Sequence, residues 1–184
     1  PVLMWAYPRE YRNAKDAAQV RGSQYNFSII KYGSPIFWVT RGYCVMENVE
    51  MPIVGSEDKE PNDTYIEQLV MDAEAAVKVI TDMGVGDPER IGVGGHSYGP
   101  FMTGNLLTHT KLFKAGIARS GAYNRTLTPF GFQAETRTFW ESPEVYNAMS
   151  PFMYANQLSG ALLLVHGELD NNTGTFPIQS ERFY

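Results

Sequence analysis

The chain has 184 residues, of which 43% are hydrophobic and 13% aromatic, which suits one globular domain and excludes a disordered or fibrous protein. Its net charge of −5 is spread over scattered side chains, so the basic surface that nucleic acid binding needs is missing. No apolar run approaches the roughly 20 residues of a membrane-spanning helix, and we expect no membrane partner. The single cysteine, Cys44, cannot form an internal disulfide and leaves the cellular compartment open.

Five apolar segments predict β-strands. Most are continuous apolar runs rather than alternating ones, which is typical of strands buried on both faces of a parallel sheet. They cover residues 2–7, 43–49, 90–95, 115–119 and 161–166. We therefore expect a mostly parallel sheet with helices on both faces.

The clearest predicted helix lies between the second and third strands. We expect its cap at Asn62 or Asp63, a capping box formed by Thr64 and Glu67, and its end at Gly84. Its apolar residues recur at helical spacing, namely Ile66, Leu69, Val70, Ala73, Val77 and Ile80. Strand and helix alternate along the chain, and that alternation predicts an α/β fold.

Residues 90–99 carry the most informative pattern, an apolar strand followed by Gly-His-Ser-Tyr-Gly and a predicted helix over 98–109. This is the pattern of the nucleophile elbow of α/β-hydrolases, with Ser97 at the tip of a tight turn. Gly95 and Gly99 flank the serine where side chains would collide. The helix directs its N-terminus at the site, so the amide of Tyr98 is free to donate a hydrogen bond to an oxyanion.

A serine nucleophile needs an acid and a general base, which follow in this fold in the order Ser, Asp or Glu, then His. The buried strand before Asp170 makes that residue the preferred acid, with Glu168 as its rival. No histidine follows Asp170. We expect each of the three present to have another role, His96 as a packing group, His109 as a helix-dipole partner and His166 in local hydrogen bonds.

Both ends of the chain fall inside predicted elements, a strand at residues 1–7 and the first turns of a helix at 176–184. We therefore expect an α/β-hydrolase domain truncated at both ends, with the catalytic histidine beyond Tyr184. Residues 126–153 interrupt the alternation with turn chemistry, and we expect them to pass over the strand ends, where specificity usually arises.

Three stretches resemble the peptidase domain of the prolyl oligopeptidase family of serine peptidases: residues 94–102, residues 41–48, and the acid segment 166–180. The resemblance covers nearly the whole chain. Within the family, residues 118–126 and 139–143 are most similar to the glutamyl endopeptidase branch.

The resemblance implies a serine peptidase that cuts peptide substrates without a metal or cofactor. It assigns the nucleophile to Ser97, the orienting acid to Asp170 and oxyanion donors to the Tyr98 amide and the Tyr7 hydroxyl. It also places a substrate-binding amide at Asn172, although Asn171 stands where many relatives carry a second aspartate. Residues 1–184 would then be part of the peptidase domain, without the family's N-terminal β-propeller and without the histidine-bearing segment.

A pocket for a glutamate side chain is expected to contain an arginine that donates two hydrogen bonds to the carboxylate. Arg125 and Arg137 are candidates in this chain, with surface or structural roles as the alternative, and the propeller could also supply the cation. Tyr123 and Phe130 are candidates for the pocket wall, although aromatic residues in such loops usually only pack them.

The leading function is therefore a serine peptidase that forms an acyl-enzyme on Ser97. Two alternatives stay open: a carboxylesterase-like hydrolase, and a non-catalytic binding module on the same fold.

Overall fold

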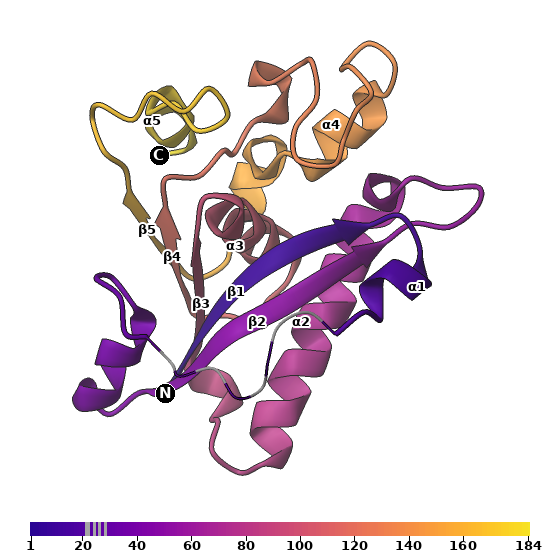
Figure 1. Ribbon diagram of the computed structural model, residues 1–184. Coiled ribbons are helices and arrows are strands. Elements are labelled where there is room, and N and C mark those ends of the chain that lie inside the picture. The colour runs from indigo at the N-terminus through magenta and orange to yellow at the C-terminus, as the bar shows by residue number, and fades with distance from the viewer. Residues whose placement is uncertain (21–22, 24, 26, 28) are drawn as a thin grey trace.

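The computed structural model describes residues 1–20, 23, 25, 27 and 29–184. Five parallel strands form one sheet in the order β2-β1-β3-β4-β5 (Figure 1). The strands are β1 (Val2–Tyr11), β2 (Cys44–Val54), β3 (Ile91–His96), β4 (Ala115–Arg119) and β5 (Ala161–Val165). The predicted parallel α/β sheet is confirmed, since parallel neighbours require a crossover and helical segments lie between consecutive strands.

Strands β1 and β2 extend further than the sequence predicts. Both continue past the main sheet as a two-stranded ribbon in which Pro8 pairs with Met51 and Tyr11 with Val54. The predicted strand ends at Tyr7, directly before Pro8, a residue that cannot donate to a strand ladder. Beyond Trp5, however, β1 has a strand partner only on the β2 side, so a proline there does not interrupt a second ladder.

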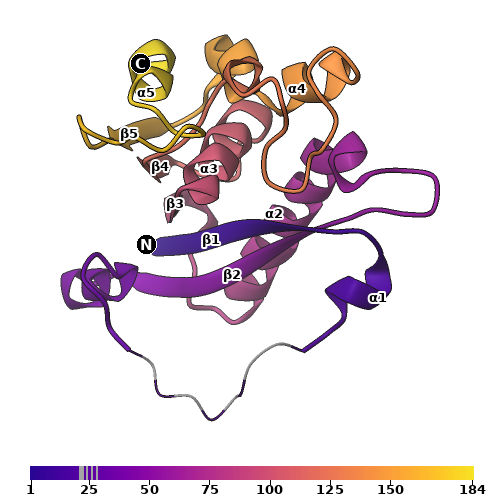
Figure 2. The same ribbon diagram turned by 45° about the horizontal axis from the view of Figure 1, so that its top comes forward.

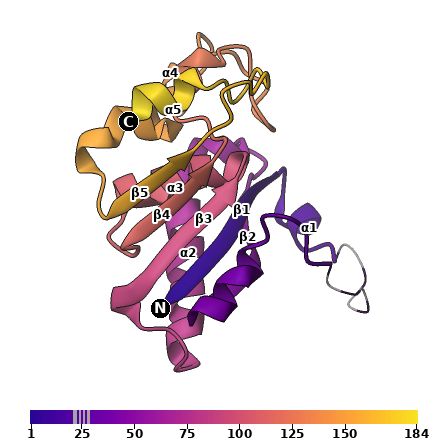
Figure 3. The ribbon, with the colours of Figure 1, turned by 90° about the vertical axis from the view of Figure 1, so that its left-hand side faces the viewer.

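Helices α2 (Tyr65–Asp82) and α3 (Tyr98–His109) pack together against one face of the sheet, and Figure 3 shows both behind the strands. Their buried side chains form the main core with Met4, Val93 and other residues of β1 and β3. Gly84, at φ 71°, follows the end of α2 as predicted. None of the helices in the described part of the chain combines the length and the apolar character needed to cross a membrane.

The expected cap of α2 is wrong in detail. A 3₁₀ turn, η2 (Pro61–Thr64), precedes the helix, and its capping box joins Glu60 and Asp63. Thr64 makes no side-chain cap and instead accepts a hydrogen bond from Gln68. The proline at the first position of η2 starts a 3₁₀ turn ahead of the helix, whereas α2 itself begins at Tyr65, directly after Thr64.

The opposite face of the sheet carries η1 (Pro35–Arg41), whose Trp38 lies near Leu3 and Ile117. The remaining short helical segments are α1 (Ala14–Ala17), η3 (Pro88–Arg90), η4 (Arg125–Leu127), α4 (Pro143–Met149), η5 (Pro151–Gln157) and α5 (Ile178–Phe183). Figures 1 and 2 show α4, α5 and the chain around them gathered above the carboxyl ends of β3, β4 and β5. The predicted excursion over the strand ends is confirmed, and it encloses the site.

Candidate active site

The turn between β3 and α3 has the geometry expected of a nucleophile elbow. Ser97 is held at φ 62° and ψ −102°, a conformation that costs energy for any residue with a side chain. A Cβ atom on Gly95 would lie 2.5 Å from the Cα of Gly99 and 2.9 Å from the carbonyl oxygen of Ala6. Glycine is therefore required beside the serine, as the sequence pattern predicted.

Ser97 stands directly before the first residue of α3, whose first amides have no acceptor within the helix. The Ser97 amide itself donates to the carbonyl of Arg119 on β4, at 3.1 Å, and this bond ties the turn to the sheet. The helix is buried from Tyr98 to Thr108, so its N-terminal dipole acts in a region largely shielded from water. This arrangement can stabilise negative charge that develops next to the Ser97 hydroxyl.

Tyr7 lies beside this elbow. Its ring meets that of Tyr98 edge-on, with the ring centres 6.1 Å apart, and 39% of the residue is exposed. A Cβ on Gly99 would be in ordinary contact with the Tyr7 ring, at 4.0 Å. The ring is thus fixed on one side by the elbow, and the residue remains accessible to a substrate.

The Tyr98 side chain is completely enclosed, and its hydroxyl donates a hydrogen bond of 2.5 Å to Glu10 Oε1 on β1. Burial raises the pKa of Tyr98 well above its ordinary value, so the phenol remains neutral. Glu10 is not predictable as a neighbour of this site from the sequence, because no local pattern links it to a residue 88 positions later in the chain.

Asp170 follows β5 in a loop at the carboxyl end of the sheet, where the acid was expected. Its Oδ1 accepts a hydrogen bond from the Asn172 amide at 3.0 Å. Its Oδ2 lies 3.3 Å from His166 Nε2 and 3.5 Å from the Thr175 hydroxyl. The carboxylate is thus held in one orientation by its own loop.

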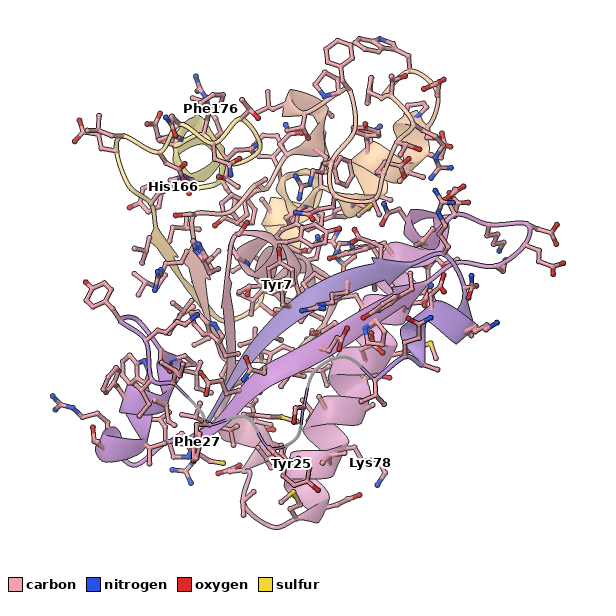
Figure 4. All side chains as sticks on the ribbon, viewed as in Figure 1. Tyr7, Tyr25, Phe27, Lys78, His166 and Phe176 are labelled. Atoms are coloured by element: carbon pink, nitrogen blue, oxygen red, sulfur yellow. The ribbon has the colours of Figure 1, made fainter. Side chains whose placement is uncertain are left out.

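His166 braces this acid loop through both ring nitrogens. Nδ1 lies 2.6 Å from Ser180 Oγ, and Nε2 lies 2.6 Å from the carbonyl oxygen of Thr175. Figure 4 shows His166 in the same region of the molecule as Phe176. With neither nitrogen free, His166 cannot accept a proton from Ser97 without breaking the loop. The expected local role is the one that this geometry supports.

The other two histidines are also engaged elsewhere. His109 Nδ1 lies 3.0 Å from the Asn105 carbonyl, at the opposite end of α3 from Ser97, about 17 Å along the helix axis. His96 Nδ1 lies 3.3 Å from the Arg119 carbonyl and lines a different cavity from Ser97. The described residues also contain no group of three or more His, Cys, Asp and Glu side chains placed to hold a metal ion.

A cavity of about 590 Å³ brings the candidate residues together. Ser97 and Tyr98 lie at one wall, and Asn172 with the following four residues lies at another. The excursion after β4 supplies the remainder of the lining, which consists of Arg125, Leu127, Thr128, Pro129, Phe130, Gly131, Phe132 and Gln133. Of these, the sequence analysis singled out Arg125 and Phe130; the others only shared the predicted excursion.

Arg125 is a buried cation in the wall of this cavity. Only 4% of the residue is exposed, and its guanidinium carbon lies 4.2 Å from the Phe101 ring centre and 4.3 Å from that of Phe132. Its Nε is buried and has no hydrogen-bond partner among the described residues. Burial lowers the pKa of Arg125, the direction expected for a cation removed from water, although an arginine remains charged at neutral pH.

Arg137, the second candidate cation, is already neutralised. It pairs with Asp63 and with Glu135, each at 2.8 Å. The hydrogen bonds to Glu135 raise the pKa of Arg137 further, and they also hold that of Glu135 below its usual range against the effect of burial. Arg137 therefore anchors the excursion and does not line the cavity.

The two aromatic candidates lie in different surroundings. Tyr123 is 0% exposed, its ring is stacked on Phe183 with centres 4.6 Å apart, and it does not line the cavity. This placement corrects the expectation that Tyr123 is a pocket wall, because the ring is needed to pack α5 against the sheet. Phe130 does line the cavity and is 78% exposed, with its ring against Trp140.

Comparison with known proteins gives one family. Residues 62–183 match the sequence profile of peptidase S9, the prolyl oligopeptidase family. The whole chain is 54% identical to the Oryza sativa subsp. japonica protein named probable glutamyl endopeptidase, chloroplastic, of which it covers 20%. It is equally similar to the Arabidopsis thaliana protein of that name and covers 19% of it.

Solved structures share the fold. All of this chain superposes on 29% of the acylaminoacyl peptidase of Pyrococcus horikoshii, with a TM-score of 0.70 and 24% identity. The chain thus spans about one fifth of the curated relatives that it matches, by the shares of 20% and 19%.

Proposed function

The chain belongs to the prolyl oligopeptidase family, and from that premise we propose that it carries the nucleophile and the acid of a serine peptidase that cuts after glutamate. The observation that carries this proposal is that Ser97 and Arg125 line the same cavity. Ser97 has a strained backbone conformation in the turn between β3 and α3, and Arg125 is buried with no hydrogen-bond partner for its Nε among the described residues. The strained serine suits acyl transfer, and the arginine suits an acidic side chain next to the bond that is cut.

In the proposed reaction, Ser97 Oγ attacks the peptide carbonyl and passes its proton to a histidine base. The Tyr98 amide and the Tyr7 hydroxyl donate hydrogen bonds to the oxyanion. The C–N bond then breaks, the leaving amine takes the proton, and an acyl-enzyme ester remains on Ser97. Water adds to this ester with the help of the same base and releases the carboxylate product.

The general base is proposed to come from a part of the full-length protein outside these 184 residues. Each of the three histidines of this chain is either engaged by other groups or directed to another cavity. Asp170 would then orient that base, as the acid does in serine peptidases generally. In the same full-length protein we propose the family's N-terminal β-propeller as the element that restricts entry to peptides.

The preference for glutamate rests on Arg125. The guanidinium carbon lies 4.2 Å from the Phe101 ring centre and 4.3 Å from that of Phe132, and Arg125 lines the cavity that contains Ser97. A carboxylate that enters the cavity would satisfy the unpaired donor and neutralise a charge that is costly to bury. The two relatives at 54% identity are named glutamyl endopeptidases, which agrees with this assignment.

Asn172 is proposed to position the substrate backbone. It lines the same cavity as Ser97, and its backbone amide donates a hydrogen bond to Asp170. Its side-chain oxygen accepts from the Gly174 amide at 2.9 Å, which leaves the amide NH₂ group to donate to a substrate carbonyl.

The test is active-site labelling of the full-length protein with a fluorophosphonate, read by intact mass, beside the Ser97→Ala variant. We expect a single adduct on the wild type and none on the variant, followed by turnover of peptides with glutamate before the cut bond. No adduct on a folded wild-type protein would contradict the proposal and favour a binding module. Turnover of simple esters without turnover of peptides would favour a carboxylesterase.

A further inference from the structure

Glu10 is a half-buried acidic residue that the proposed mechanism does not use, and it is bonded to Tyr98, which lines the cavity. It lies on the ribbon formed by β1 and β2, and it accepts the hydrogen bond from the Tyr98 hydroxyl at 2.5 Å. The Tyr98 ring in turn lies 5.4 Å from the guanidinium carbon of Arg125. One tyrosine side chain thus stands between a carboxyl group and the cation of the cavity.

We propose that Glu10 sets the charge of the cavity. When Glu10 is ionised, its negative charge opposes the positive charge of Arg125. When Glu10 is protonated, the charge of Arg125 is free to attract an acidic substrate side chain. This inference rests on the proposed function, since it concerns how that site selects its substrate. It makes Glu10 a specificity-determining residue that acts through Arg125 and does not touch the reacting atoms.

The groups around Glu10 leave few other charges that could have this effect. Tyr65 on α2 and Tyr98 on α3 are both buried, and burial keeps their pKa values well above the ordinary range, so both stay neutral. Glu135 also acts on Glu10, but it is already bound to Arg137. Arg125, on η4, is therefore the cation whose charge Glu10 can compensate.

No direct ion pair among the described residues neutralises the charge of Arg125. The described residues include no salt bridge within 4.0 Å that involves Arg125, whereas Arg137 has two at 2.8 Å. Glu10 and Arg125 interact over a longer distance through a region of low polarity, where Coulomb forces are only weakly screened. Such a pair can change a substrate preference without closing the cavity.

Two opposing effects act on the pKa of Glu10. Burial raises the pKa of Glu10, while the Tyr98 hydrogen bond and the positive charge of Arg125 partly oppose that rise. A free glutamate side chain titrates near pH 4.3. Because burial raises the pKa of Glu10 above that of a free glutamate side chain, there is a pH range in which the substrate carboxylate is ionised while Glu10 is still protonated, and the attraction to Arg125 is then greatest.

The experiment uses the full-length protein and two peptides that differ only in Glu or Gln before the cut bond. The ratio of their kcat/KM values is measured from about pH 5 to pH 8.5, because a ratio cancels every group that acts on both peptides alike, including the catalytic histidine. For the wild type we expect the Glu/Gln ratio to fall as pH rises.

Glu10→Gln should abolish this fall and hold the ratio high, so that at pH 8 it exceeds the wild-type ratio by ~3-fold or more. Glu67→Gln, which neutralises an exposed glutamate on α2, is the matched control and should follow the wild type. A Glu10→Gln protein whose ratio follows the wild-type curve at every pH would overturn the inference.

Tyr98→Phe gives a second, independent readout that does not require Glu10 to be replaced. It removes the hydrogen bond that stabilises the ionised carboxylate and keeps the ring, so the midpoint of the pH-dependent fall should move to higher pH. An unchanged midpoint would overturn the inference. Peptide turnover that survives Ser97→Ala would instead contradict the proposed function, so the two failures are distinguishable.

Discussion

A Cβ atom on Gly95 would lie 2.5 Å from the Cα of Gly99, so the strand before the nucleophile and the helix after it are in backbone contact. We predict that Gly95→Ala disrupts this contact, because neither backbone can move away without displacing Ser97. The full-length variant should lose at least ~2 kcal/mol of stability in its peptidase domain and should not label with fluorophosphonate. Thermal unfolding and intact mass measure the two effects.

The control for this prediction is Gly167→Ala, where a new Cβ would meet no atom within 4 Å. It should change stability by no more than about 0.5 kcal/mol. If Gly95→Ala labels as fast as the wild type, the elbow does not depend on this contact.

Arg125, which is buried, and Arg137, which is half-buried, are two arginines of the excursion with opposite expectations. Arg125→Met removes a cation whose Nε lacks a partner, so it should leave stability equal or higher while lowering kcat/KM for the glutamate peptide by ~100-fold relative to its glutamine counterpart. Arg137→Met removes the cation that pairs with the buried carboxylate of Glu135, and it should destabilise the domain by about 3 kcal/mol. Calorimetry measures the stability of both variants, and steady-state kinetics measure their substrate preference. An Arg125→Met enzyme that still prefers glutamate would show that Arg125 does not determine specificity.

Tyr7→Phe tests the second oxyanion donor. The ring can keep its edge contact with Tyr98 when the hydroxyl is removed, so we expect folding to be preserved. The loss should fall on kcat, by ~100-fold, with KM nearly unchanged, because an oxyanion donor acts in the transition state. Tyr154→Phe, on η5 beside His109, serves as the control and should leave kcat unaltered. Equal kcat for Tyr7→Phe and the wild type would assign Tyr7 a packing role.

Asp72 on α2 gives a prediction about stability against pH. Burial raises its pKa to about 6, and its Oδ2 has no hydrogen-bond partner among the described residues. Between about pH 4 and pH 6 the unfolded chain has lost this proton while the folded chain keeps it, so stability falls as pH rises through that window. Above pH 6 the contribution levels off.

Asp72→Asn should therefore stabilise the domain at pH 7 by roughly 1 kcal/mol, a value below the full shift because the side chain is only partly buried, and should have little effect at pH 4. Glu74→Gln, at an exposed position of the same helix, is the control. The measurement is calorimetric unfolding of the full-length protein at both pH values. A stabilisation that is the same at pH 4 and pH 7 would show that the carboxyl group is not the cause.

Much of the fold was predictable because its signals are local. Continuous apolar runs gave all five strands, and the Gly-x-Ser-x-Gly spacing located the elbow to the residue. The errors lie where one segment depends on another. The extension of β1 to Tyr11 needs β2 as its partner, and the cap of α2 depends on the 3₁₀ turn that begins at Pro61.

The candidate site also contains residues whose positions follow from the local sequence and residues whose positions depend on tertiary packing. Ser97 directly follows β3, and Asp170 and Asn172 lie in the loop after β5, so their positions at one end of a parallel sheet follow from chain order. Ser97 and Asn172 line one cavity. The two arginines could not be told apart by sequence, because which of them meets carboxylates depends on how the excursion folds over the sheet. Tyr123 was misplaced for the same reason, since its stacking partner Phe183 is distant in the chain.

The sequence by itself thus determined the chemistry that this chain can supply: a serine on a strained turn, an acid on the next-but-one strand and the order of elements that puts them at one edge. Only the tertiary structure decided the charge of the cavity. It buried Arg125 between two aromatic rings, engaged Arg137 with two carboxylates, and brought Glu10 to Tyr98 across 88 residues. Backbone conformation is determined largely by residues that are neighbours in the sequence, whereas the energy of a charge depends on all the groups that surround it in space.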